Sequence, residues 1–419
     1  MTAAPYPRPA SRPQRRTVAV GLSRFPTVTE TFILREVTEM ERQGQPVRLV
    51  PLIKENPPVV HDAAKPWTQR ALYTPWLNGA ILIANLITFA KHPLRYLGVL
   101  LRLILGTLKA PQTLIGTLGI YPKSIYLARE LEREGVRHIH VHYASHPSTM
   151  ALIVSKFAPV TYSFTVHAFD IQGDRSLLDW KIRESRFVRS ISRFNKRFLE
   201  GLYPGDARGK IHVVHVGIEP DVYATNASKY AAVPGRILCV AGHRPYKGLP
   251  YLIEACRILR DEGVAFECNL VGHGPMHDEL VQMIADRNLG DRVHLIGPRP
   301  EEEVAKMMAE ASLFVLPSIV DKDGMMEGIP VALMEGMATG RAVVSTTTAG
   351  IPELVDDGVS GFLVPPQDPP ALARAIRTLI EDPERARGMG ERGREKVRSE
   401  FDLRDSATQL LALTDRENP

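Results

Sequence analysis

Two glutamates frame the segment with the clearest chemical pattern: Glu327 and Glu335, with seven residues between them. Pro330 suits the first turn of a helix, because its fixed φ and missing N–H are harmless there. Apolar residues then recur at helical spacing as far as Gly340, a typical helix stop. The pattern predicts a loop acid and a helix acid facing one cleft, beside a helix N-terminus that suits phosphate. A surface helix with two solvated acids is the alternative.

The rest of the chain must supply the elements that position these acids. Strand and helix patterns alternate, which is typical of parallel, doubly wound sheets. Strands are predicted at 17–22, 47–52, 138–142, 160–166, 236–241, 265–271, 293–296 and 313–317. Helices are predicted at 31–43, 124–134, 148–157, 249–262, 276–287, 301–310 and near 402–414.

Length and composition fit two globular domains. A chain of 419 residues is long for one core. Residues 17–216 and 235–401 are the predicted domains, joined by a polar linker at 217–234 and followed by a helix within 402–419. The first 16 residues are rich in Pro and Arg and predict a flexible arm without a signal peptide. The three cysteines lack C-x-x-C spacing, so neither disulfides nor a zinc site is expected.

Charge is distributed unevenly along the chain. Residues 1–210 hold 30 Lys and Arg against 15 Asp and Glu, whereas the remainder holds 22 against 32. Nucleic acid is one explanation for a basic half, but no known nucleic-acid-binding signature is present. We therefore expect no nucleic-acid partner.

A basic, apolar insertion at 63–120 contributes to the excess of basic residues in the first half and suggests a more specific partner than nucleic acid. Residues 63–129 contain no acidic residue, and two apolar blocks lie at 81–90 and 96–108. The first block has only about half of the roughly 20 residues that a bilayer crossing needs, and the second carries Arg102 in its middle, so neither is expected to span. Apolar faces with basic flanks and nearby aromatic residues predict a helical pair lying in an anionic membrane surface. The alternative is that the helices pack inside the N-terminal domain.

Several motifs resemble known enzymes in the same order. The two-Glu segment, residues 350–354 and 357–364, and the glycine turn at 271–275 are similar to the retaining family 4 glycosyltransferases. Residues 22–26, 140–147 and 164–171 resemble glycosyltransferases that build bacterial exopolysaccharides such as colanic acid. The resemblance runs from about Thr17 to Phe401. It implies the GT-B fold, two Rossmann-like doubly wound parallel-sheet domains facing a central cleft, with the last helix crossing back to the N-terminal domain.

The resemblance also implies how the leaving group is stabilised. A nucleotide-sugar presents a diphosphate, whose growing charge is stabilised by a metal or by fixed cations. The chain lacks a D-x-D motif in the family position, so no metal is expected. Lys247 would neutralise the donor phosphates. The family's usual Arg has no clean counterpart, and Arg244 or His243 is the candidate replacement.

The remaining site residues follow from the same carry-over. Glu335 would bind the ribose hydroxyls, because two carboxylate oxygens suit a vicinal diol. Glu327 would bind hydroxyls of the transferred sugar, and His167, at a strand end, would contact that sugar. Asp170 would either orient His167 or hold local backbone. The other expected donor contacts are Gly272, Gly274, Gly328, Ile329, Pro330 and Val331, and the loop of Gly21 and Ser23 would approach phosphate or acceptor.

The expected protein is therefore a metal-independent, retaining, hexosyl-type glycosyltransferase with a UDP- or GDP-sugar cosubstrate and no other cofactor. Its acceptor would be a lipid-linked saccharide in exopolysaccharide or cell-envelope glycan synthesis. It would be cytoplasmic and peripheral at the inner face of the cell membrane. A nucleotide-sugar epimerase and a noncatalytic, sugar-nucleotide-binding membrane scaffold are the alternatives.

Overall fold

The computed structural model describes residues 15–27, 31–57, 62–76 and 78–417. These residues form two compact units. The first unit holds the chain up to His142, the segment His146–Ser163 and the chain from Leu411; the second holds Tyr143–Ser145 and Phe164–Leu410. Nearly all of the predicted N-terminal arm lies outside the described residues.

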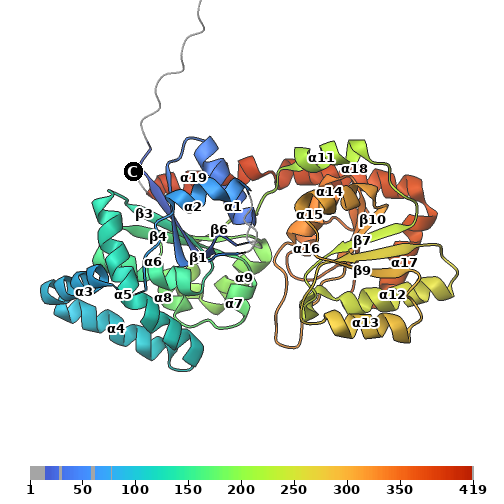
Figure 1. The fold of residues 1–419 in the computed structure, drawn as a ribbon. Coiled ribbons are helices and arrows are strands. Elements are labelled where there is room, and N and C mark those ends of the chain that lie inside the picture. The colour runs from blue at the N-terminus through green and yellow to red at the C-terminus, as the bar shows by residue number, and fades with distance from the viewer. Residues whose placement is uncertain (1–14, 28–30, 58–61, 77, 418–419) are drawn as a thin grey trace, which may run out of the picture. The chain divides into compact units, whose positions relative to one another are not determined.

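The first six-stranded sheet has the order β2-β1-β3-β4-β5-β6 (Figure 1). Its strands are β1 (Val18–Phe25), β2 (Val47–Lys54), β3 (His138–His142), β4 (Thr161–Val166), β5 (Val188–Ser190) and β6 (Ile211–Val213). β1 pairs in parallel with both β2 and β3, and β5 pairs in parallel with β4 and β6. Most strand residues are buried, as expected of a parallel sheet with helices on both faces.

The second six-stranded sheet has the order β12-β11-β10-β7-β8-β9. Its strands are β7 (Arg236–Val240), β8 (Glu267–Val271), β9 (Val293–Gly297), β10 (Leu313–Leu316), β11 (Ala342–Thr346) and β12 (Gly361–Val364). The chain runs outward from β7 to β9 and then returns to the other side of β7. The strand order therefore reverses between β7 and β10, and ligands of doubly wound sheets bind at the carboxyl ends beside such a reversal.

Helices cover both faces of each sheet in Figure 1. Those up to β6 are α1 (Thr31–Arg42), η1 (Asp62–Ala64), α2 (Lys65–Arg70), α3 (Gly79–Lys91), α4 (Pro93–Thr107), α5 (Pro111–Arg133), α6 (His146–Phe157), α7 (Phe169–Gln172), α8 (Leu178–Glu184), α9 (Arg193–Leu202) and α10 (Pro204–Ala207). Those after β6 are α11 (Pro220–Lys229), η2 (Pro245–Lys247), α12 (Leu249–Asp261), α13 (His277–Asp286), α14 (Glu301–Glu310), α15 (Val331–Ala338), α16 (Ile351–Leu354), α17 (Pro369–Glu381), α18 (Pro383–Glu400) and α19 (Leu403–Glu417).

The predicted strands and helices are present, with shifts of a few residues at most ends. The helix expected at 124–134 is longer, because α5 already begins at Pro111 inside the basic insertion. The segment 217–234, expected to be a linker, contains α11, which packs on α14 and α15. β5 and β6 have three residues each, too few for an apolar period to be recognised.

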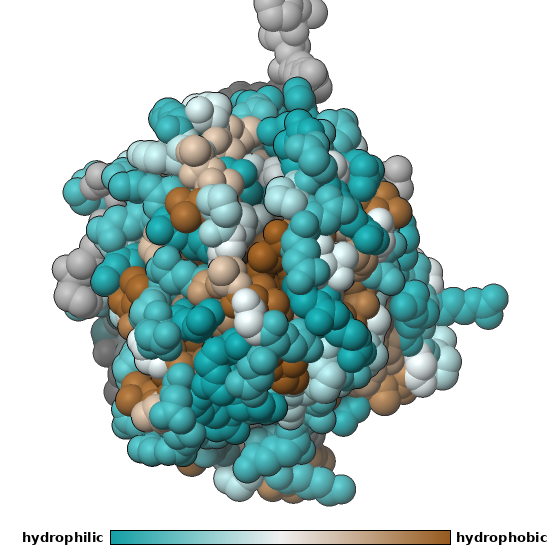
Figure 2. Space-filling view, turned by 90° about the vertical axis from the view of Figure 1, so that its right-hand side faces the viewer, coloured by the Kyte–Doolittle hydropathy of each residue, from teal (hydrophilic) through white to brown (hydrophobic). Residues whose placement is uncertain are grey.

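The surface differs from one region to another. Hydrophilic residues predominate on the face shown in Figure 2, and hydrophobic residues reach that surface only in patches between them. No helix among the described residues combines the length and the apolar character that a bilayer crossing requires.

Candidate functional site

The helix predicted to carry Glu335 is α15, and it lies in the second unit. Pro330 was expected in the first turn but occupies the N-cap, so α15 begins one residue later, and Gly340 follows the helix at φ 74°. The Oε1 atom of Glu335 accepts a hydrogen bond of 2.6 Å from the hydroxyl of Tyr223 on α11. This hydrogen bond therefore helps to hold the half-buried carboxylate in a fixed direction.

Lys247 and Glu327 form an ion pair. Lys247 follows β7 and Glu327 follows β10, so the pair joins the two loops beside the reversal of strand order. Their side chains are only 17% and 15% exposed. The pKa of Lys247 is lowered to about 8, mainly by burial and to a smaller extent by the positive charge of Arg244, while Cys239 opposes the shift. The Glu327 carboxylate, which contacts the Lys247 ammonium, favours the charged form of Lys247.

The two candidates for the second cation differ in exposure. Arg244 is exposed next to Lys247, at the N-cap of η2. His243 is fully buried, and its Nδ1 lies 3.3 Å from Nδ1 of His277. Burial, followed by the neighbouring His277 and His273, lowers the pKa of His243. A neutral, buried imidazole cannot serve as a fixed cation, so the geometry favours Arg244.

The glycine turn at Gly272 and Gly274 has a packing explanation. Gly272 adopts φ 138°, and a Cβ atom there would lie 2.0 Å from the carbonyl oxygen of Ala241. A Cβ at Gly274 would lie 2.7 Å from the carbonyl oxygen of His243. The ends of β7 and β8 thus approach too closely for any side chain, whether or not a nucleotide binds there.

His167 and the Gly328 loop approach each other within the second unit. A Cβ atom at Gly328 would lie 2.7 Å from the carbonyl oxygen of His167 and 2.7 Å from Cδ1 of Ile191. Only glycine allows this approach, which brings the loop of Glu327 to the end of β4. His167 is buried, and its ring lies 4.7 Å, centroid to centroid, from the ring of Tyr143 at an interplanar angle of 46°.

Asp170 holds the backbone around His167. Its Oδ1 accepts from the N–H groups of His167 at 2.8 Å and Ala168 at 3.0 Å, and its Oδ2 accepts from Ala144 at 2.7 Å. Ala168 has φ 117°, a conformation that L-residues adopt only when their surroundings enforce it. Burial raises the pKa of Asp170, and the three N–H contacts oppose that rise.

A buried lysine supports the same turn. Lys181 on α8 donates to the carbonyl oxygens of Ala144 at 2.7 Å and Ser145 at 3.1 Å. Burial lowers its pKa to about 7, although Asp174 and Asp170 favour the charged form. Asp170 and Lys181 therefore stabilise the turn at Ala144 and Ser145, Asp170 through an N–H group and Lys181 through C=O groups.

Gly21 and Ser23 lie on β1 in the first unit, whereas the site residues described above belong to the second unit. A Cβ atom at Gly21 would lie 2.6 Å from Cγ1 of Val141 and 3.0 Å from Cε of Met150. Close packing therefore accounts for this glycine. The expectation that Gly21 and Ser23 form a loop was wrong, because β1 runs on to Phe25, and a phosphate or acceptor role for them stays a prediction.

Sequence reasoning assigned no role to Glu353, which fixes the start of α9. Its carboxylate accepts from the N–H groups of Arg193 at 2.7 Å and Phe194 at 2.8 Å, and lies 3.3 Å from Nε2 of His215. Burial alone would raise the pKa of Glu353, but these contacts lower it overall. Glu353 belongs to the 350–354 motif, so the sequence marked its position, but it could not predict which residues Glu353 contacts.

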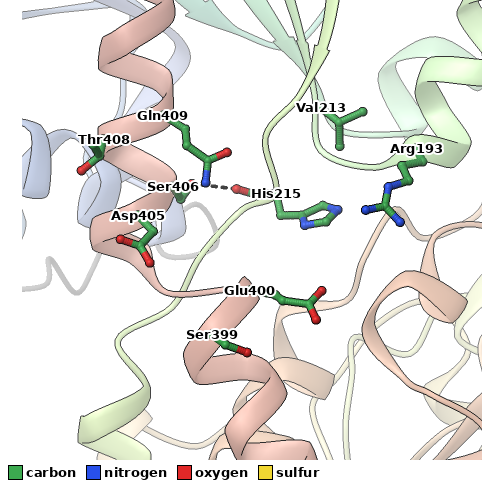
Figure 3. A pocket seen from close by; sticks show the side chains of 9 residues that line it. All are labelled: Arg193, Val213, His215, Ser399, Glu400, Asp405, Ser406, Thr408 and Gln409. Atoms are coloured by element: carbon green, nitrogen blue, oxygen red, sulfur yellow. Dashed lines mark hydrogen bonds between the residues drawn. The ribbon is translucent and has the colours of Figure 1, made fainter.

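A cavity of about 410 Å³ lies elsewhere in the second unit (Figure 3). It is lined by Arg193, Val213, His215, Ser399, Glu400, Asp405, Ser406, Thr408 and Gln409. None of the predicted site residues lines it. Among the described residues, no group of three or more His, Cys, Asp or Glu side chains is arranged to hold a metal ion.

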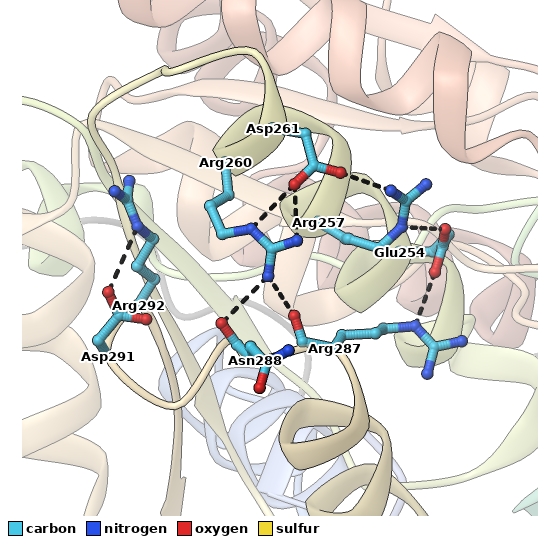
Figure 4. A network of polar contacts seen from close by, with 8 residues as sticks. All are labelled: Glu254, Arg257, Arg260, Asp261, Arg287, Asn288, Asp291 and Arg292. Atoms are coloured by element: carbon cyan, nitrogen blue, oxygen red, sulfur yellow. Dashed lines mark hydrogen bonds and ion pairs between the residues drawn. The ribbon is translucent and has the colours of Figure 1, made fainter.

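A charged network on the outside of the second unit has a structural role (Figure 4). Glu254 on α12 accepts from Nε of Arg257 at 2.6 Å and from Nε of Arg287, after α13, at 2.7 Å. Arg260 and Asp261 extend the network. These partly exposed pairs join α12 to α13, and solvent screens such pairs strongly.

Comparison with known sequences identifies relatives. A family model described as Glycosyl transferases group 1 matches residues 230–396. WcaL of Escherichia coli (strain K12), a putative colanic acid biosynthesis glycosyltransferase, is 31% identical over 426 residues, covering 94% of this chain and 98% of WcaL. The amylovoran biosynthesis glycosyltransferase AmsK of Erwinia amylovora is 42% identical over 207 residues, 49% of this chain. That match spans about half of AmsK, 51% of its length.

Solved structures show the same fold. The Anabaena protein HepE, solved in complex with UDP, has a TM-score of 0.67 at 16% identity, covering 96% of this chain and 100% of HepE. Sucrose-phosphate synthase from Thermosynechococcus elongatus has a TM-score of 0.70 at 17% identity, covering 96% of this chain and 99% of that enzyme. At these identities the likeness shows the fold alone. It confirms the predicted GT-B architecture of two parallel, Rossmann-like sheets.

Proposed function

This chain belongs to the group 1 glycosyltransferases, and from that premise we propose that it moves a sugar from a nucleotide-sugar to a saccharide acceptor with retention of configuration. The observation that carries the proposal is the Lys247–Glu327 ion pair beside the reversal of strand order. Glu327 also lies eight residues before Glu335, whose carboxylate is oriented by Tyr223. A cation for a diphosphate and two carboxylates for hydroxyl groups are the groups that such a donor requires.

In the proposed reaction, donor binding exchanges the Lys247–Glu327 contact for contacts with the donor. Lys247 and Arg244 stabilise the departing diphosphate, Glu335 binds the ribose, and Glu327 and His167 bind the transferred sugar. The acceptor hydroxyl attacks the anomeric carbon from the face that the diphosphate leaves. The bond from that carbon to the phosphate oxygen breaks, and the hydroxyl proton passes to the departing diphosphate. No enzyme nucleophile is needed.

The acceptor is inferred from the relatives. WcaL and AmsK are described as glycosyltransferases of colanic acid and amylovoran biosynthesis. We propose that this chain likewise extends a lipid-linked saccharide in exopolysaccharide or cell-envelope glycan synthesis. It would then work in the cytoplasm, peripherally at the inner face of the cell membrane.

Nucleotide binding tests the donor class. We expect one of UDP, GDP and ADP to raise the Tm, with the same shift in EDTA because cationic side chains are available to the diphosphate. Glu335→Gln should weaken that nucleotide about 10- to 100-fold, since a hydrogen bond to a charged group is worth about 1.5–3 kcal/mol. Tyr223→Phe, which keeps the carboxylate, should weaken it less.

Product analysis separates the proposal from its alternatives. Transfer with retention gives a product with the donor's anomeric configuration in its NMR spectrum. A donor whose sugar is epimerised without transfer would show an epimerase instead. Nucleotide binding without turnover in the presence of membrane-extracted acceptor would show a binding scaffold.

Lys247 should give the transfer a pH dependence. The ammonium form is needed at the diphosphate, and its pKa is about 8. The charge is present below that pH and lost above it, so kcat/KM should fall by about tenfold per pH unit on the alkaline side. In Lys247→Arg the guanidinium stays charged, and the fall should move to higher pH. An unchanged profile in this variant would assign the titration to another group.

A further inference from the structure

The helices α3 and α4 form a hairpin in the first unit whose outer side is apolar. α3 ends at Lys91 and α4 begins at Pro93, and both helices pack on α5 (Figure 1). Of the nineteen exposed large hydrophobic side chains among the described residues, twelve lie between Trp76 and Leu118. We call these twelve the hairpin face: Trp76, Leu82, Ile83, Leu86, Phe89, Leu94, Leu97, Leu101, Leu105, Leu108, Ile115 and Leu118.

The leucines of α4 show that this exposure is organised. Leu94, Leu97, Leu101, Leu105 and Leu108 recur at intervals of three and four and therefore form one stripe, in which Leu94 is 86% exposed. The opposite side of the helix is formed by Val99, Leu103 and Thr107, which are buried. Packing within the unit is thus satisfied without the stripe, and folding alone does not require these leucines.

Basic residues border the leucine stripe. Arg95 and Arg102 are exposed on α4, and Lys91 and Lys109 are exposed just beyond its two ends. At about 100° per residue, Arg95 and Arg102 project from the same side of the stripe, between the exposed leucines and the buried side of the helix. Long basic side chains in that position can reach past an apolar layer to anionic groups above it. No acidic residue occurs from 63 to 129 to offset them.

We propose that the hairpin face lies in the surface of an anionic lipid bilayer, with the leucines among the acyl chains and the four basic residues at the head groups. A second copy of this chain fits less well. In a two-fold interface the same basic border would meet itself without acidic partners, and like charges across an interface disfavour association. The inference extends the proposed function, because it names the surface where a lipid-linked acceptor would be met.

Trp76 supplies an internal probe of this surface. Of the three tryptophans, Trp67 and Trp180 are buried, whereas Trp76 is 52% exposed on the hairpin face. We expect vesicles containing phosphatidylglycerol to shift Trp76 emission to the blue, and brominated acyl chains to quench it. Affinity should be at least about tenfold higher than for pure phosphatidylcholine, and should fall with added salt. Trp76→Phe should abolish the optical signal and leave cosedimentation measurable.

The leucine stripe is tested by Leu97→Gln/Leu101→Gln/Leu105→Gln, which alters only exposed side chains and should keep the Tm. We expect this variant to lose at least about tenfold in vesicle affinity. The matched control is Leu202→Gln/Val222→Gln/Val281→Gln, three exposed apolar residues of the second unit, which should bind as the wild type does. Arg95→Glu/Arg102→Glu should remove the preference for anionic lipid, whereas Arg374→Glu/Arg398→Glu should not.

The proposal is overturned if the triple leucine variant binds vesicles as tightly as the wild type. It is also overturned if the wild type sediments as a dimer that this variant dissolves, because the face would then be covered by a second copy. The vesicle assay contains no donor and no acceptor. Its failure would therefore leave nucleotide binding and sugar transfer untouched, and failure of the nucleotide assay would leave this surface untouched.

Discussion

Lys247→Met is expected to lower kcat about 10²- to 10³-fold, the effect of removing a fixed charge from a departing anion. Methionine keeps the apolar stem, so the packing between the loops after β7 and β10 should survive. The substitution also leaves the poorly exposed Glu327 carboxylate without its cation, which could itself disturb the loop. Steady-state kinetics with the nucleotide-sugar identified by binding would measure the loss.

A double variant separates these two causes. In Lys247→Met/Glu327→Gln the carboxylate charge is gone as well, so a fall in Tm caused by an unpaired Glu327 would be recovered. A loss caused by the missing cation at the diphosphate would remain. Lys306→Met is the matched control, because Lys306 is exposed and lies 3.8 Å from Glu310 in a surface pair. Its kcat should stay within about twofold of the wild type. A control that loses as much activity would contradict the role of Lys247.

The sequence predicted those parts of the fold that depend on local pattern. Alternating strands and helices are read from apolar periods of two and 3.6 residues, and the helix of Glu335 was found in this way. The loops that carry Lys247 and Glu327 could be placed at strand ends for the same reason. The two loops come together because β7 and β10 are neighbours in the sheet. The apolar pattern of either strand does not predict which strands are neighbours.

Contacts between distant residues could not be predicted. Tyr223 lies in a segment expected to be a linker, and 112 positions separate it from the Glu335 carboxylate to which it donates. Glu353 meets the start of α9 across 160 positions. Such pairs arise because a buried polar group needs a partner, and packing rather than local pattern decides which one it finds. The positive φ of Ala168 could not be predicted from the sequence either, because alanine, unlike glycine, is not a residue typical of positive φ.

Asp170→Ala is expected to destabilise the protein by about 3–5 kcal/mol, because it removes a buried, hydrogen-bonded charge. Three buried N–H groups would lose their acceptor, and two of them hold Ala168 at φ 117°. Lys181 would also lose a nearby negative charge. Urea unfolding would measure the change, with His167→Ala as the control that leaves all three N–H contacts in place. A loss below about 1 kcal/mol would contradict this account.

Asp170→Asn tests whether Asp170 positions His167 or only holds the backbone. Asparagine keeps one carbonyl oxygen, so the N–H groups of His167 and Ala168 can retain an acceptor while that of Ala144 loses its partner. The protein should then be destabilised by an intermediate amount, about 1–3 kcal/mol. If Asp170 acts through His167, adding Asp170→Asn to His167→Ala should lower kcat little further, because the group being positioned is already gone. Losses that multiply in the double variant would instead show that Asp170 serves the turn of Tyr143–Ser145 independently of His167.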